Sequence, residues 1–257
     1  MTHDTVEVAV LGPIVVRGAA GPFRRSAARE LIVYLAFHRH GVRHAEWSLA
    51  LWPDRPVSLA TAHSTSSDAR RALGRDAAGR PHLPRGVDLR LGDSVTTDVD
   101  HFASLATTDH PYGLHRAMRL VRGPVFAGLH RTDWAVFDGT QPDIEALVVR
   151  TALRGADAFV ELGCGDEAEW MVRKALRVSP YDERLYRALL VATAAQGNRA
   201  RLHAAMAQLR TLAGEVARPP ARPAVGAGAG CLHPATTDLY RDLLLGSPAA
   251  GGHPARL

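Results

Sequence analysis

Lysine, cysteine and long apolar runs are all scarce in this chain of 257 residues. Lys174 is the only lysine, so arginine carries almost all of the positive charge. The two cysteines, Cys164 and Cys231, lie far apart, and this spacing argues against a disulfide framework and against a zinc site. The longest apolar run, Leu31 to Phe37, is far shorter than the roughly 20 residues that a helix needs to cross a bilayer. Because the N-terminus also lacks the basic and apolar regions of an export signal, the sequence predicts a cytoplasmic protein without a membrane span.

The overall composition is that of an ordinary globular protein. Hydrophobic residues make up 46% of the chain and charged residues 22%, which excludes a wholly disordered or fibrous chain. The length allows either two small domains or one large domain.

The positive charge is concentrated in the N-terminal part. From Arg17 to Arg90 the chain has 13 arginines and six acidic residues, an excess of seven, whereas the net charge of the whole chain is +5. Such an excess is typical of a module that binds a polyanion, but solvated surface arginines give the same count. The charge by itself leaves both interpretations open.

The first hundred residues mix strand and helix signals. Residues 6–16 alternate and break at Gly12-Pro13, which predicts two short strands around a turn. Apolar spacing of three and four residues then predicts helices over 26–38, 44–52 and 58–74, the last with Ser58 as its N-cap.

The helix at 58–74 has two different faces. The core stripe is expected to consist of Leu59, Ala62, Ser66, Ala69 and Leu73. The opposite face carries small polar and charged residues that suit the approach to a nucleic-acid groove, namely Thr61, Ser64, Ser67, Asp68 and Arg71.

The segment 81–91 completes this N-terminal domain. Leu83, Val87, Leu89 and Leu91 around a bend of proline, arginine and glycine predict a β-hairpin. Strands, three helices and a terminal hairpin describe a winged helix-turn-helix over residues 1–96, in which the second helix of the pair enters the major groove.

After Asp98 the strand signal disappears, so we expect a second, all-helical domain over residues 97–246 and a disordered tail over 247–257. The stretch from Arg218 to Gly230 is rich in proline, alanine and glycine and predicts a flexible loop. The predicted helices span 98–107, 111–122, 141–163, 166–178, 182–196, 199–213 and 234–245. The fold class is therefore mainly α, with an α+β N-terminal domain.

A repeat indicates how these helices pack. Gly165-Asp166, with Ala168 and Ala175, recurs 32 residues later as Gly197-Asn198, with Ala200 and Ala207. This period is close to that of a tetratricopeptide helix pair, in which small residues let two helices pack closely.

Several short motifs carry a family resemblance in their order and spacing. The chain resembles bacterial transcriptional activators of the antibiotic-regulatory-protein type, in which a winged helix-turn-helix precedes a tetratricopeptide-like bacterial transcriptional activator domain. The N-terminal motifs are Leu11-Gly12-Pro13, Leu51-Trp52-Pro53-Asp54, Arg70-Arg71-Ala72-Leu73-Gly74 and Asp98-Val99-Asp100-His101-Phe102. The later ones are Leu120-Val121-Arg122-Gly123, Gly128-Leu129, Trp134, Gly165-Asp166, Pro180-Tyr181-Asp182-Glu183, Gly197-Asn198-Arg199-Ala200 and Thr237-Asp238-Leu239-Tyr240.

The resemblance implies a DNA interface. Arg70 or Arg71 would contact phosphate or guanine in the major groove, Ser64 and Ser67 would position the helix on the backbone, and Arg85 would reach the neighbouring minor groove. Each has a plainer alternative, because Arg70 flanks the core stripe and can pair with an acid, and serines are often simply solvated. The expected DNA-binding residues are Ser64, Ser67, Asp68, Arg70, Arg71 and Arg85.

The chain departs from the family pattern on the same helix. Asp68 and Ala69 stand where the family usually has a basic and a larger aliphatic residue, and a Pro/Gly insertion precedes the last helix. A carboxylate on the exposed face is repelled by phosphate, although it can accept a hydrogen bond from cytosine. On this basis Asp68→Arg is expected to strengthen DNA binding.

No other chemistry emerges from the pattern. His38, His40 and His44 straddle a helix end without a carboxylate or thiol at ligand spacing, and no phosphate loop or catalytic constellation is visible. We therefore expect neither an enzyme nor a cofactor or metal. Phe159 and Trp170 are expected to pack in the helical core, although tetratricopeptide arrays also present aromatic residues to partners.

Two functions remain open. The first is a transcriptional regulator that binds double-stranded DNA as a homodimer, with the helical domain contacting RNA polymerase; the resemblance implies direct-repeat half-sites. The second is a helical-repeat interaction module whose winged domain has lost specific DNA binding.

Overall fold

The computed structural model describes residues 4–130, 132–216 and 232–246. The chain divides into two compact units, the first formed by Met1–Thr107 and Arg119–Leu147 and the second by Thr108–Met118 and Val148–Leu257. The loop expected at 218–230 and the tail expected at 247–257 lie outside the described residues, as does Cys231.

A small mixed sheet begins the first unit. β1 (Val6–Ala9) pairs antiparallel with β2 (Val15–Arg17), which confirms the two strands predicted around the Gly12-Pro13 turn. β3 (Val95–Thr97) was not predicted; it pairs parallel with β1, giving the order β2-β1-β3. Three residues are too few to show the alternation by which a strand is found in a sequence.

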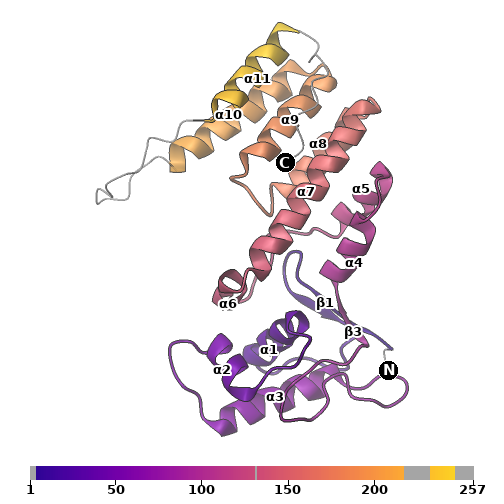
Figure 1. Cartoon of the computed structure of the whole chain (residues 1–257), viewed down its shortest axis with the longest axis vertical. Coiled ribbons are helices and arrows are strands. Elements are labelled where there is room, and N and C mark those ends of the chain that lie inside the picture. Colours follow the sequence, from indigo (N-terminus) through magenta and orange to yellow (C-terminus); the bar gives the residue numbers. More distant parts are fainter. Residues whose placement is uncertain (1–3, 131, 217–231, 247–257) are drawn as a thin grey trace, which may run out of the picture. The chain divides into compact units, whose positions relative to one another are not determined.

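The three helices predicted next are confirmed. α1 (Ser26–Phe37), α2 (His44–Leu51) and α3 (Leu59–Leu73) lie next to one another (Figure 1), with α1 packed against both others. The core between them includes Trp47, which is 2% exposed. α1 is buried on most sides, since every residue from Glu30 to Ala36 is in the interior, whereas α3 buries only one side of its surface.

The ends of α3 are set by two residues of suitable chemistry. The side chain of Ser58 accepts a hydrogen bond from the backbone N–H of Thr61, and Gly74 ends the helix at a φ of 78°. The buried stripe differs from the prediction, because Leu59 is 66% exposed and the interior side chains are Ala62, Thr65, Asp68, Ala69, Ala72 and Leu73.

The prediction of a β-hairpin over 81–91 is wrong, because the structure has a loop there and no paired strands. Leu89 forms an isolated bridge with Val42, and Pro81 forms another with Arg75. The backbone N–H of Gly92 donates to the carbonyl of His82 at 2.8 Å, which closes the loop. The leucines of this segment point into the core instead of alternating along a ribbon, as the burial of Leu83, Leu89 and Leu91 shows.

The first unit continues beyond Thr97 into α4 (Asp98–Ala106). The Asp98 carboxylate accepts hydrogen bonds from the backbone N–H groups of Val10 at 2.7 Å and Leu11 at 3.1 Å, and Arg122 donates to it at 3.3 Å. Gly12 has a φ of 143°, and a Cβ there would lie 2.7 Å from the Arg122 Cβ, so only glycine fits this turn. α6 (Asp133–Phe137) is too short for its periodicity to be visible in the sequence.

The remaining helices confirm the all-helical region. α7 (Thr140–Glu161) runs from the first unit into the second, which also contains most of α5 (Pro111–Arg119). α8 (Gly165–Ala175), α9 (Glu183–Ala195), α10 (Arg199–Val216) and α11 (Pro234–Leu245) complete the second unit. α9 packs against α8, α10 and α11 (Figure 1). In the part of the chain that the structure describes, no helix combines the length and apolar character needed to span a membrane.

The small residues of the repeat behave differently in its two copies. Ala168 and Ala175 are buried, as close helix packing requires, whereas Ala200 and Ala207 are exposed. Phe159 is fully buried, and Trp170 is partly buried with its ring stacked on His115. The expectation of core packing is therefore confirmed for Phe159. Trp170 is packed on one side and keeps part of its surface exposed.

Candidate nucleic-acid interface

The outward face of α3 is polar and open to solvent. Ser64, Ser67 and Arg71 are exposed on it, as predicted. The Ser64 hydroxyl donates to the carbonyl of Ala60 at 2.8 Å, which leaves the lone pairs of the oxygen available to a donor from outside. Ser64 can therefore accept a hydrogen bond from a ligand on this face while keeping its own bond to the helix.

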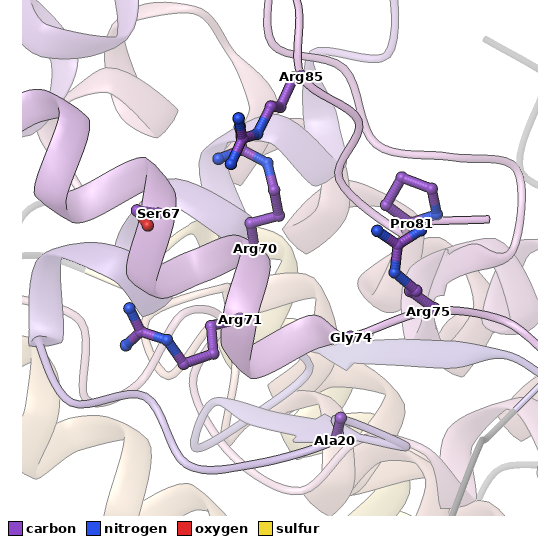
Figure 2. A pocket seen from close by; sticks show the side chains of 8 residues that line it. All are labelled: Ala20, Ser67, Arg70, Arg71, Gly74, Arg75, Pro81 and Arg85. Carbon is purple, nitrogen blue, oxygen red and sulfur yellow. The ribbon is translucent and has the colours of Figure 1, made fainter. Parts of the chain in front are cut away.

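A basic pocket of about 480 Å³ lies beside the C-terminal half of α3 (Figure 2). It has four arginines and no acidic side chain in its lining, which consists of Ala20, Ser67, Arg70, Arg71, Gly74, Arg75, Pro81 and Arg85. Like charges in one concavity repel one another, and an anion entering it would relieve that repulsion.

Arg70 joins α3 to the loop at 81–91. Its Nε donates to the carbonyl of Leu83 at 3.0 Å, and its guanidinium lies next to that of Arg85 in Figure 2. Burial, and after it the positive charge of Arg85, lowers the pKa of Arg70, which nevertheless stays protonated because guanidinium is so basic. The two cations therefore form one positive edge of the pocket.

Arg71 and Arg75 form the other part of the pocket. The Arg71 side chain is 58% exposed, and its Nη1 lies 3.3 Å from Oδ1 of Asp68. Arg75 was not among the predicted contacts; its Nη1 donates to the carbonyl of Gly79 at 2.7 Å. Its only signal in the sequence is its place two residues after the end of α3.

The prediction that Asp68 lies on the exposed face is wrong, because this residue is 4% exposed. Its Oδ2 accepts hydrogen bonds from the backbone N–H groups of Arg24 and Arg25, both at 3.0 Å. Asp68 follows Thr65 by three residues and precedes Ala72 by four, so helical spacing places it beside the buried stripe. Its charge suggested exposure, whereas its hydrogen bonds explain why a carboxylate is tolerated inside.

A second pocket, of about 670 Å³, shares Ser67 and Arg71 with the first. Its lining brings residues that precede α1 together with α3, and it consists of Arg24, Arg25, His63, Ser64, Ser67, Asp68 and Arg71. Of these, Arg24, Arg25 and His63 were not predicted as contacts. The adjacent pair Arg24-Arg25 just before the helix at 26–38 was the available signal, but only the fold places it beside α3.

Comparison with known proteins identifies the helical region. Residues 107–222 match the family model of the bacterial transcriptional activator domain. Over these residues the chain is similar to bacterial transcriptional activator domains. The family of that model is one of transcriptional activators and not of enzymes. The resemblance seen in the short motifs is thereby confirmed.

A solved structure extends the likeness to the N-terminal region. The chain is similar to Mycobacterium tuberculosis EmbR, solved in complex with a low affinity phosphopeptide, with a TM-score of 0.60 and 22% sequence identity. The alignment covers 95% of this chain and 66% of that chain, so this chain spans less than two thirds of the EmbR chain. At this identity the likeness concerns the fold, which confirms a small N-terminal sheet with helices followed by an all-helical region around the activator domain. A search of curated protein sequences found no match.

Proposed function

We propose that the first unit binds double-stranded DNA and that α3 enters the major groove. The observation that carries this proposal is the basic pocket beside α3, in which four arginines converge without an acidic side chain in the lining. The phosphates of DNA supply the anionic partner that such a surface requires. The activator domain over 107–222 supports the same function, because transcriptional activators act at DNA.

The predicted contacts take different parts in this interface. Arg71 is exposed on α3 and contacts a base edge or a phosphate in the groove, while Ser64 and Ser67 contact the backbone. Arg70 is held by Leu83 and, together with Arg85, faces a phosphate from the side of the 81–91 loop, whose Arg85 end reaches toward the minor groove. Asp68 is buried, so its part is to support its neighbours and not to touch DNA.

Arg71→Ala tests this proposal. We expect about tenfold weaker binding and a salt dependence shallower by about one unit, because a phosphate or guanine contact is lost. The measurement is fluorescence anisotropy on a fragment of the protein's own upstream genomic DNA and on a random duplex, each over a range of salt concentrations. Arg17→Ala, which removes one charge from β2 where Arg17 pairs with Glu7, is the matched control.

Two results would contradict the proposal. One is equal binding by wild-type protein and Arg71→Ala. The other is weak binding to both duplexes that vanishes as salt rises, which would favour a helical-repeat interaction module without specific DNA binding.

We further propose that residues 1–96 form the DNA-binding region and residues 97–246 the helical region. The helical region mediates homodimerisation and contact with RNA polymerase. Large side chains exposed in the second unit support this, namely Tyr112 at 56%, Leu162 at 59% and Tyr181 at 66%. Sedimentation that finds only monomers up to high protein concentration would overturn the dimer.

A further inference from the structure

The second pocket, beside the start of α1, has more positive than negative charge in its lining. Three arginines line it, and Asp68 is the only acidic residue among its lining residues. Arg24 and Arg25 are both exposed. Among the residues that the structure describes, no acidic side chain forms an ion pair with the guanidinium of either one, because Asp68 accepts only from their backbone N–H groups. The pocket therefore has an excess of positive charge that the protein itself does not balance.

Both oxygens of the Asp68 carboxylate accept hydrogen bonds from within the protein. Oδ2 accepts from the backbone N–H groups of Arg24 and Arg25, both at 3.0 Å, and Oδ1 faces Nη1 of Arg71 at 3.3 Å. One buried side chain thus fixes the backbone from which two arginines project and the guanidinium of a third. The carboxylate does not point at a ligand but organises the cations around it.

We propose that this pocket binds a phosphodiester group of the DNA backbone, with the side chains of Arg24, Arg25 and Arg71 as its ligands and Asp68 as their positioning residue. The proposal rests on the proposed function and extends the interface from α3 to the residues that precede α1. The hydroxyl of Ser67, in the same lining, is a donor that suits a phosphate oxygen. The ring of His63, also in the lining, offers a further nitrogen that can donate a hydrogen bond to a phosphate oxygen.

Asp68→Asn separates this proposal from simple electrostatics. If Asp68 were only a negative charge near DNA, its removal would strengthen binding. As a positioning residue it has the opposite effect, because the asparagine amide turns a donor toward the backbone N–H groups or toward Arg71 and loosens the three arginines. Asp68→Glu keeps the charge and both acceptors and is expected to restore part of the binding.

The experiment measures anisotropy of the full chain on a duplex that the wild-type protein binds, over a range of salt concentrations. Arg24→Ala and Arg25→Ala should each weaken binding about three- to tenfold and lower the salt slope by about one, whereas Arg17→Ala should change the affinity by less than about twofold. Asp68→Asn should weaken binding by a similar factor. Combined with Arg25→Ala it should add less than it costs alone, since one of the three arginine contacts that it loosens is already lost.

The possible failures are distinguishable. If the wild-type protein binds no duplex specifically, the proposed function fails and this proposal fails with it. If Arg71→Ala weakens binding but Arg24→Ala and Arg25→Ala behave like Arg17→Ala, only the phosphate site at α1 is overturned. If Asp68→Asn binds more tightly, or if its loss simply adds to that of Arg25→Ala, the positioning role is overturned. The two arginine variants leave Asp68 intact, so they decide the site even where Asp68→Asn folds poorly.

Discussion

Arg70 and Arg71 are adjacent in the sequence but have different surroundings. Arg70 is half-buried and donates to the carbonyl of Leu83, so it holds the 81–91 loop against α3. Arg71 is exposed and meets the carboxylate of Asp68. A substitution at Arg70 therefore alters the local fold together with the charge, and Arg71 is the cleaner probe of DNA contact.

Gly74 illustrates a strict requirement at a single residue. Its φ is 78°, and a Cβ placed there would lie 2.5 Å from the Cβ of Ala20. We expect Gly74→Ala to lower the free energy of unfolding by about 1–3 kcal/mol, because backbone strain and a steric clash act together. Urea denaturation measures the change.

Gly79→Ala is the control for this substitution. Gly79 has a similar φ of 75°, but nothing lies within 4 Å of a Cβ built on it. It should show only the strain of the backbone, so the difference between the two variants reports the clash with Ala20. Equal losses in both variants would rule out the clash.

Among the elements, the helices of the second unit are joined by a polar cluster as well as by apolar packing. Glu169 of α8 accepts hydrogen bonds from Arg173 at 2.6 Å, Gln196 at 3.0 Å and Arg201 at 3.1 Å. Burial raises the pKa of this carboxyl, but the hydrogen bonds from Gln196 and Arg173 and the charges of Arg173 and Arg201 outweigh burial, so the pKa is lower than usual. The cluster therefore stabilises the fold through the ionised form of Glu169.

This cluster makes the stability depend on pH. A depressed carboxyl pKa contributes stability above the ordinary glutamate value of about 4.3, and the contribution is lost as the pH falls through the lower folded value. Glu169→Gln should therefore cost about 1–3 kcal/mol near neutral pH, where it leaves charged donors without their partner, and much less in acid. Denaturation at several pH values measures this, with the exposed Glu167→Gln on the same helix as control. A loss independent of pH would contradict the assignment.

In the molecule as a whole, the compact units do not follow the order of the chain. Residues 98–107 and 119–147 belong with the N-terminal sheet and helices, whereas 108–118 belong with the second unit. Two residues beyond the domain boundary expected at 96/97 bind the N-terminal region. Asp98 accepts hydrogen bonds from the backbone N–H groups of Val10 and Leu11, and Arg122 donates one to the carbonyl of Pro13 at 2.6 Å. The division into a DNA-binding region at 1–96 and an activator region at 97–246 stays a prediction.

Fragments of the chain test where the first unit ends. Residues 1–96 alone should unfold at a lower temperature than residues 1–139, because the shorter fragment leaves the backbone N–H groups of Val10 and Leu11 without their buried acceptor. Asp98→Asn in the longer fragment should reproduce part of this loss, since an amide cannot accept both bonds. Thermal unfolding followed by circular dichroism gives the midpoints, and equal midpoints for the two fragments would contradict the prediction.

Most of the helices and the first two strands can be predicted from local sequence alone. Amphipathic spacing placed α1, α2 and α3, and Ser58 marked the start of α3. Helical periodicity placed the longer helices that follow Asp98. These features are local, since each depends on residues a few positions apart. The exposed Ser64, Ser67 and Arg71 followed from the same helical geometry.

Features that depend on distant residues required the three-dimensional fold. β3 is a strand because it pairs with β1, which lies about 90 residues earlier in the chain. The 81–91 segment is a loop because its leucines are buried in the core and Leu89 forms an isolated bridge with Val42. The surroundings of Asp68 are of the same kind, because its partners Arg24 and Arg25 lie more than 40 residues away. A carboxylate read in a sequence is expected at the surface, and only the donors that the fold brings to it show that it is buried and paired.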